Sequence, residues 1–281
     1  MKKIAVVGAG TMGAGIAQVA AEAGFQVGLV DVKDEFLQKG LSTIRRFVGR
    51  KLEKAKISKE EHDAIMARLK GTTRLAEALD GAELVVEAVL EKMELKKRVF
   101  QEMDAICPAG VLLASNTSTL SITEIASAAK RPERVAGTHF FSPVPVMRLV
   151  EVIKGARSGE GFIAQATEFC RVVGKEPIVV KDVPGFIVNR FLCLLYNEGA
   201  YQLMNQVGSK EDIDKGLKLG ANHPMGVFEL MDAVGVDVIY YALESMWEAT
   251  KEERYRPCPL FKQMVAENRL GRKTGEGFYK Y

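Results

Sequence analysis

The chain has 281 residues, of which 47% are hydrophobic and 27% charged, and its formal net charge is +3. This composition is ordinary for a globular protein, and the length allows one large or two ordinary domains with a sizeable core. The small net charge gives no reason to expect nucleic acid or a membrane surface as a partner.

The cysteines and the apolar stretches indicate the compartment. No two cysteines lie within three residues of each other, which excludes a CxxC redox or zinc pair, and we expect no metal site. Scattered single cysteines are typical of a reducing environment. The N-terminus lacks the long apolar run of a signal peptide, and the most apolar later stretch, 186–204, is interrupted by polar and charged residues. We therefore expect a cytoplasmic protein. The cysteines are Cys107, Cys170, Cys193 and Cys258.

The first 31 residues predict a β-strand, an α-helix and a second β-strand. Residues 3–7 form a short apolar run that ends in glycine, residues 12–23 are small and apolar, and residues 27–30 form another apolar run before Asp31. Strand, helix and strand within about 30 residues form the βαβ unit of a parallel sheet.

Residues 34–79 interrupt the alternation of strands and helices. A long charged amphipathic helix is predicted over 35–56, a break at 57–58, and a second helix from Lys59. Ser58 and Glu61 have the spacing of a capping box, which marks the start of that second helix. We therefore expect a helical hairpin inserted into the order of the sheet.

Alternation resumes after the hairpin and stops near residue 183. Further strands are predicted at 84–88, 111–115, 135–139, 149–153 and 177–180, with helices at 93–106 and 122–129. Beyond Pro184 only helical periodicity remains, over 186–207, 210–219, 227–234 and 236–250. The pattern predicts an α/β fold, with a doubly wound Rossmann-type domain over 1–183. An all-helical domain over 184–281 follows, and its apolar surface predicts packing on a second copy as a homodimer.

The turn after the first strand has the G-x-G-x-x-G pattern of a dinucleotide site. The glycines allow a tight turn, a close approach of the pyrophosphate and close packing of helix on strand, while the helix N-terminus attracts phosphate. Asp31 ends the next strand, where a carboxylate binds the ribose hydroxyls and favours NAD over NADP, although Lys33 lies near. The alternatives are FAD, which uses the same pattern, and a turn without a ligand. The pattern comprises Gly8, Ala9, Gly10, Thr11, Met12 and Gly13.

His139 is the catalytic candidate among the three histidines. His62 lies on a charged helical face and His223 precedes a proline in a loop, whereas His139 ends a strand among apolar residues. Ligands of open α/β sheets bind beyond the carboxyl ends of the strands, so a histidine there can exchange a proton with a hydroxyl or carbonyl. A core histidine with satisfied hydrogen bonds accounts for its position equally well.

Glu151 favours the catalytic interpretation, because a carboxylate that interrupts an apolar strand needs a partner. If the sheet brings it to His139, it fixes the imidazole tautomer and favours the imidazolium. Asn116, Ser118 and Asn189 are further polar residues in apolar or strand-end settings. For Ser118, an ordinary helix cap is a strong alternative.

These residues lie in motifs that resemble the L-3-hydroxyacyl-CoA dehydrogenases, and among them the short bacterial 3-hydroxybutyryl-CoA dehydrogenases. The resemblance covers essentially the full length. The motifs are VGAGTMG at 7–13, VEA at 86–88, SNTS at 115–118, HFFSPVPVM at 139–147, PGFIVNR at 184–190 and KTGEGFY at 273–279.

The resemblance implies a role for each site residue. His139 becomes the acid–base group at the C3 oxygen, Glu151 orients it, and Ser118 and Asn189 bind the substrate near the reacting carbon. The hairpin would close over CoA, with Lys54 at its phosphates. Besides the glycine turn, the residues expected to line NAD are Asp31, Glu91, Lys96, Asn116, Ser142 and Lys273.

Two positions depart from the family's pattern. Ser142 stands where asparagine is common, and because serine is shorter we expect a cofactor hydrogen bond there to be lost or to run through water. Phe47 stands where a serine would reach CoA, and the basic run Lys51, Lys54 and Lys56 fits a solvated face equally well.

The sequence thus predicts reversible hydride transfer between NAD(H) and C3 of a short (S)-3-hydroxyacyl-CoA or 3-oxoacyl-CoA, the acyl-CoA being the partner. One alternative is a dehydrogenase of the same fold acting on a CoA-free hydroxy acid or sugar acid. The other is a dinucleotide-binding protein without catalysis, against which the set of Ser118, His139, Glu151 and Asn189 argues.

Overall fold

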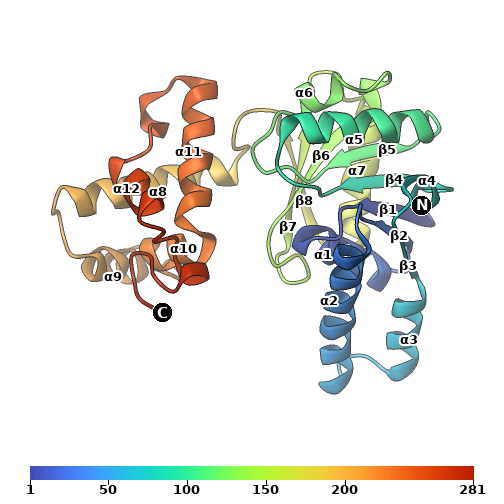
Figure 1. The fold of residues 1–281 in the computed structure, drawn as a ribbon, viewed down its shortest axis with the longest axis horizontal. Helices are drawn as coiled ribbons and strands as arrows, with labels where there is room; N and C mark the ends of the chain where they lie inside the picture. Colours follow the sequence, from blue (N-terminus) through green and yellow to red (C-terminus); the bar gives the residue numbers. More distant parts are fainter. The chain divides into compact units, whose positions relative to one another are not determined.

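The computed structural model describes all residues from Met1 to Tyr281, and the chain forms two compact units, Met1–Val183 and Pro184–Tyr281 (Figure 1). No helix combines the length and apolar character that crossing a membrane requires. The α/β fold with a helical C-terminal part agrees with the predicted fold class.

The first unit is built on one eight-stranded sheet with the order β3-β2-β1-β4-β5-β6-β7-β8. All neighbouring strands are parallel except β6 and β7, which are antiparallel. The carboxyl ends of β1, β2, β4, β5 and β6 therefore meet at one edge, where such sheets bind ligands. The strands are β1 Lys3–Val7, β2 Gln26–Val30, β3 Leu69–Thr72, β4 Leu84–Glu87, β5 Leu112–Ser115, β6 Val135–Phe140, β7 Leu149–Lys154 and β8 Glu176–Lys181.

Helices cover both faces of this sheet. The larger apolar cluster joins the sheet to α1, α2 and α7, while α4, α5 and α6 pack on the opposite face. Side chains alternate between faces along each strand, so the register places Glu87, Ser115, His139 and Glu151 together on the face of α4, α5 and α6. The helices are α1 Thr11–Glu22, α2 Asp34–Glu53, α3 Lys59–Ala67, α4 Leu75–Leu79, α5 Met93–Ile106, α6 Ile122–Ala126 and α7 Glu160–Val172.

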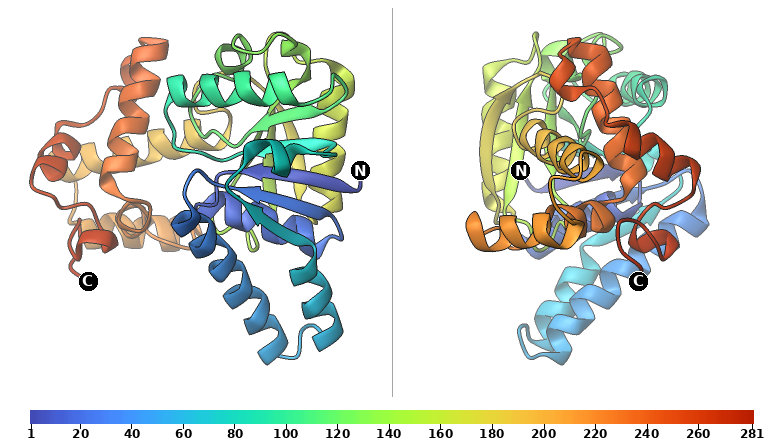
Figure 2. Two further views of the ribbon diagram at one scale, coloured as in Figure 1. Left: turned by 45° about the vertical axis from the view of Figure 1, so that its right-hand side comes forward. Right: turned by 90° about the vertical axis from the view of Figure 1, so that its left-hand side faces the viewer.

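The inserted hairpin consists of α2 and α3, which lie against each other and project beyond the sheet (Figures 1 and 2). The predicted capping box is confirmed, because Ser58 Oγ accepts from the Glu61 N–H and Glu61 accepts from the Ser58 N–H. The predicted extent of 34–79 was too long. Its last part forms the edge strand β3 and the short helix α4. The strand β3 was not predicted because its sequence, Leu-Lys-Gly-Thr, is neither apolar nor alternating.

The second unit is helical around its own apolar cluster, which includes Phe228, Leu243 and Phe261. The helices α10 and α11 have the predicted bounds, and α12 was not predicted. Two fully buried carboxylates anchor the C-terminal segment: Asp232 accepts the N–H groups of Phe278 and Tyr279, while Asp214 accepts the Tyr279 hydroxyl. The helices are α8 Val188–Met204, α9 Lys210–Gly220, α10 Val227–Val234, α11 Val236–Thr250 and α12 Pro259–Ala266.

Candidate active site

The turn between β1 and α1 has the shape of a phosphate site. Gly8 has φ +103°, and a Cβ there would lie 2.6 Å from the Ala88 carbonyl oxygen. A Cβ at Gly13 would lie 1.8 Å from the Gly8 oxygen, whereas one at Gly10 would meet no protein atom within 4 Å. Gly8 and Gly13 are thus required by the protein's own packing. Gly10 leaves space in front of the N-terminus of α1, where unpaired N–H groups and the helix dipole favour a phosphate.

Asp31 follows β2 and is tied to this turn. Its Oδ2 accepts a hydrogen bond from the Ala9 N–H at 2.7 Å. The carboxylate therefore supports the turn and lies at the carboxyl ends of the strands. The exposed ammonium of Lys33 lies 3.8 Å from Glu35 Oε1, which gives it a carboxylate partner other than Asp31.

His139 and Glu151 are brought together as the sequence predicted. They are register partners on β6 and β7, and His139 Nδ1 lies 2.8 Å from Glu151 Oε2. Both are buried, with 4% and 0% of their surface exposed, and the His139 ring packs on Phe141 with ring centroids 4.4 Å apart. A carboxylate at Nδ1 directs the acid–base chemistry of the imidazole to Nε2.

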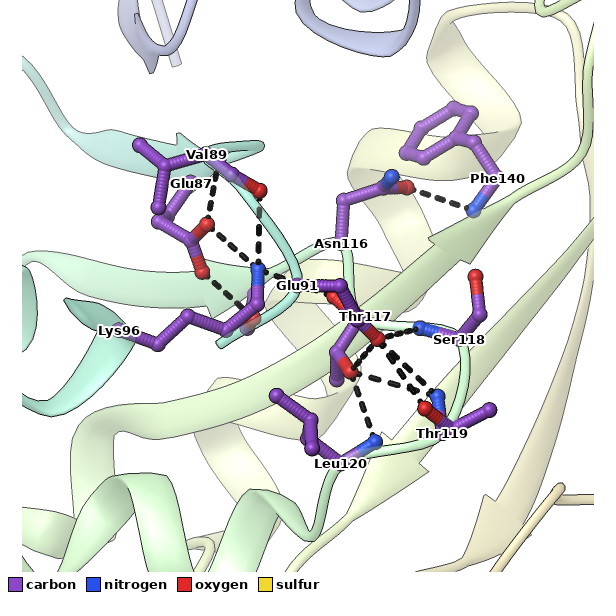
Figure 3. A network of polar contacts seen from close by, with 11 residues as sticks. Glu87, Val89, Glu91, Lys96, Asn116, Thr117, Ser118, Thr119, Leu120 and Phe140 are labelled. Atoms are coloured by element: carbon purple, nitrogen blue, oxygen red, sulfur yellow. Dashed lines mark hydrogen bonds and ion pairs between the residues drawn. The ribbon is translucent and has the colours of Figure 1, made fainter. Parts of the chain in front are cut away.

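Asn116 and Ser118 lie in the loop after β5, beside the end of β6 (Figure 3). Asn116 Oδ1 accepts the Phe140 N–H at 2.9 Å, which holds the loop to the strand that carries His139. The backbone N–H of Ser118 donates to Glu91 Oε1 at 2.8 Å. The capping role considered for Ser118 belongs to Ser121, whose hydroxyl accepts the Glu124 N–H at the start of α6.

Glu91 and Lys96 lie on the other side of this loop (Figure 3). The Lys96 side chain is fully buried, and its Nζ lies 2.7 Å from Glu87 Oε1 and 3.4 Å from Glu91 Oε2. The ammonium is therefore enclosed by protein groups. Glu91 keeps 38% of its side chain exposed and remains accessible to a ligand.

Comparison with known proteins identifies the family. Residues 3–183 match the 3-hydroxyacyl-CoA dehydrogenase NAD binding domain, and residues 185–281 match the C-terminal domain of the same enzymes. The chain belongs to the 3-hydroxyacyl-CoA dehydrogenase family.

Relatives of known name support this assignment over the whole chain. A 3-hydroxybutyryl-CoA dehydrogenase from Bradyrhizobium diazoefficiens is 42% identical, covering 100% of this chain and 96% of the relative. The mitochondrial hydroxyacyl-coenzyme A dehydrogenase of Rattus norvegicus is 43% identical, covering 100% and 91%. The crystal structure of (S)-3-hydroxybutyryl-CoA dehydrogenase from Ralstonia eutropha has a TM-score of 0.97 and 41% identity, covering 100% of this chain and 99% of that one.

Within this dehydrogenase fold, three polar residues near the site were not singled out from the sequence. Glu87 and Ser115 end β4 and β5, and Ser115 Oγ donates to Glu87 Oε2 at 2.7 Å. The available signal for Glu87 was a carboxylate at the end of an apolar strand, just as a carboxylate within an apolar strand was the signal for Glu151. Lys175 donates to the Val144 and Met147 carbonyls and so fixes the loop that follows Ser142, and burial lowers the pKa of its ammonium.

The remaining predicted residues of this dehydrogenase are on other elements of the fold. Lys54 is an exposed residue at the C-terminal end of α2. Asn189 and Lys273 belong to the second unit, where Asn189 lies in the first turn of α8. Lys273 Nζ lies 2.5 and 2.6 Å from the two oxygens of Asp237. In place of the expected serine, Phe47 has the guanidinium groups of Arg46 and Arg50 over its ring, 5.3 and 5.8 Å from the ring centroid.

Proposed function

We propose that this protein transfers hydride reversibly between NAD(H) and C3 of a short (S)-3-hydroxyacyl-CoA or 3-oxoacyl-CoA, with 3-hydroxybutyryl-CoA and acetoacetyl-CoA as substrates. The observation that carries this proposal is the buried His139–Glu151 pair, on the sheet that also carries the glycine turn and Asp31. The names of the full-length relatives support the choice of an acyl-CoA.

The glycine turn fits the dinucleotide. The open space at Gly10 and the start of α1 suit a pyrophosphate, and the Asp31 carboxylate suits the ribose hydroxyls. Bound NAD(H) supplies or accepts the hydride. The protein's contribution is to bind the cofactor, orient the substrate and move one proton.

His139 handles that proton at Nε2. In the direction of reduction, protonated His139 donates to the carbonyl oxygen at C3, and in oxidation neutral His139 accepts the proton of the C3 hydroxyl. Glu151 holds the ring through Nδ1 and stabilises the imidazolium. Ser118 and Asn189 orient the substrate near C3, whereas Asn116 and Ser142 border the nicotinamide side. Glu91 and Lys273 complete the proposed cofactor contacts, and Lys54 contacts the CoA phosphates.

We assign the two units different roles. The unit Met1–Val183 binds NAD, and Pro184–Tyr281 forms a homodimer, an assignment supported by its exposed apolar side chains. The most exposed of these are Phe191, Val207, Leu219 and Tyr241. The four free thiols support a cytoplasmic location. Sedimentation equilibrium tests the dimer: a mass of one chain at micromolar concentration would contradict it.

The substrate is tested by following NADH absorbance with acetoacetyl-CoA and, in parallel, with acetoacetate, which lacks CoA. We expect kcat/KM to be larger for acetoacetyl-CoA by at least about 10³-fold, because remote binding energy contributes to the rate at the reacting carbon. A free hydroxy acid or oxo acid that competes better than acetoacetyl-CoA would contradict the acyl-CoA assignment. If NADH absorbance does not fall with either compound, the proposed reaction itself is contradicted.

A further inference from the structure

Three charged side chains form a continuous chain beneath the loop that carries Ser118 (Figure 3). Glu87, at the end of β4, is ion-paired with Lys96 of α5, and Lys96 reaches Glu91 in the segment between them. Glu91 in turn accepts hydrogen bonds from the loop after β5. The chain thus links the end of β4 and the helix α5 to the loop after β5.

The Glu87 end of this chain is rigid. Its Oε1 accepts from Lys96 Nζ and from the Val89 N–H, each at 2.7 Å, and its Oε2 accepts the Ser115 hydroxyl. Glu87 and Ser115 are register partners on neighbouring strands, and Glu87 and Lys96 are fully buried. The bonds of this carboxylate are therefore made to strand β5, to the segment after β4 and to helix α5.

The Glu91 end of the chain holds the loop. One carboxylate oxygen, Oε1, accepts the Ser118 N–H at 2.8 Å, the Thr119 N–H at 3.2 Å and the Thr117 hydroxyl. The other oxygen lies 3.4 Å from Lys96 Nζ. The ammonium thereby fixes which oxygen of this half-exposed carboxylate faces the loop.

A buried ion pair is weak grounds for stability, because the cost of desolvating two charges offsets their attraction. Two carboxylates around one ammonium also leave a net negative charge in this cluster. A role in orienting Glu91 explains why a costly buried ion pair with excess negative charge is present here. An apolar pair in place of Glu87 and Lys96 would fill the same volume but would not hold Glu91 in one orientation.

We infer that Glu87 and Lys96 are positioning residues, which act through Glu91 to hold the backbone of Ser118 and Thr119 in place for catalysis. This positioning role is separate from the cofactor contact expected of Lys96. The inference rests on the proposed function in one respect: it takes Ser118 as a substrate-orienting residue.

The test uses the double variant Glu87→Gln with Lys96→Met, which leaves no unpaired buried charge. The matched control is Lys97→Met, the same change at the next residue of α5, where Lys97 pairs instead with Glu124 at 2.6 Å. Amide hydrogen exchange is measured at Ser118 and Thr119, together with kcat for acetoacetyl-CoA reduction and the Kd of NADH.

We expect exchange at both amides to become about tenfold faster or more in the double variant, as expected for a locally loosened loop. We expect kcat to fall about tenfold or more, since misplaced orienting groups reduce the rate of the chemical step. Every value for Lys97→Met stays within about threefold of wild type.

Unchanged exchange at Ser118 and Thr119 in the double variant would overturn the inference, because the pair would then not position the loop. A rise in the Kd of NADH with unchanged exchange would leave Lys96 only a direct role at the cofactor. The exchange measurement needs no substrate. If the wild type fails to reduce acetoacetyl-CoA, the proposed function falls, and the exchange rates still decide the positioning role.

Discussion

His139 and Glu151 face each other across the antiparallel pair of strands in the sheet, and His139 Nδ1 lies 2.8 Å from Glu151 Oε2. Directly opposed residues of an antiparallel pair bring their side chains into contact without distortion of the backbone. The reversal of β7 relative to its neighbour β6 therefore delivers a carboxylate to a histidine at the ligand-binding edge of an otherwise parallel sheet.

Replacing Glu151 with Gln should slow catalysis while preserving the fold of the site. The amide oxygen can still accept a hydrogen bond from Nδ1–H, but the charge that stabilises the imidazolium is lost. A hydrogen bond to a charged group contributes roughly 1 kcal/mol more than a neutral one, so kcat should fall about tenfold. Steady-state kinetics check this expectation, and a kcat equal to that of wild type would show that Glu151 has only a structural role.

Replacing Asp31 with Asn should weaken the preference for NADH over NADPH. The side-chain oxygen can still accept the Ala9 N–H, so the turn is kept while the charge that repels a 2′-phosphate is removed. Loss of a charge-assisted hydrogen bond changes the ratio of kcat/KM values for the two cofactors by about 10- to 100-fold. An unchanged ratio would mean that another group, such as Lys33, sets cofactor choice.

Replacing Lys54 with Ala should raise KM for acetoacetyl-CoA without changing kcat. A surface contact between a lysine and a phosphate contributes little, so the expected increase is about two- to fivefold and should shrink at high salt. Lys56→Ala is the matched control, because it removes another exposed lysine of the same basic run. Equal effects of the two variants would indicate a general electrostatic attraction and no specific contact by Lys54.

Acid should destabilise the protein in part through Asp104. Burial favours the neutral carboxyl, but the hydrogen bond and charge of Arg134 and the Lys130 N–H outweigh it and lower the pKa of Asp104. A lowered pKa in the folded state means that this stabilisation is present above the ordinary pKa of aspartate and is lost as the pH falls through the folded value.

Asp104→Asn tests this assignment by urea unfolding between about pH 2 and pH 7. The variant leaves Arg134 buried without its counter-charge and should lower the free energy of unfolding at neutral pH by about 3–5 kcal/mol. Its remaining stability should fall less steeply with acid than that of wild type. Parallel pH profiles for the two proteins would contradict the role of Asp104.

The sequence predicted those elements whose signals are local. A local sequence pattern indicates each of these features: the glycine turn, Asp31, the Ser58 capping box and the helices α10 and α11. The strand β3 gave no such signal, because an edge strand of four residues buries little and its pattern is set by pairing with β2. The limits of the hairpin were wrong for this reason.

The polar network around Ser118 was beyond prediction for a different physical reason. Glu87 and Ser115 meet because β4 and β5 pair in one particular register, and Lys96 reaches them because α5 packs on this face of the sheet. Neither relation is encoded by spacing along the chain. Glu151 was found from sequence because its own strand is apolar on both sides, although its distance from His139 required the structure.

The most direct test of the central claim is single-turnover reduction of acetoacetyl-CoA by NADH in wild type and in His139→Gln. General acid–base catalysis contributes about 10²- to 10⁴-fold, so the rate of the chemical step should fall by that factor in the variant. NADH affinity, measured by fluorescence, should stay nearly unchanged because the glycine turn and Asp31 are intact. A variant that reduces acetoacetyl-CoA at the wild-type rate would contradict the account.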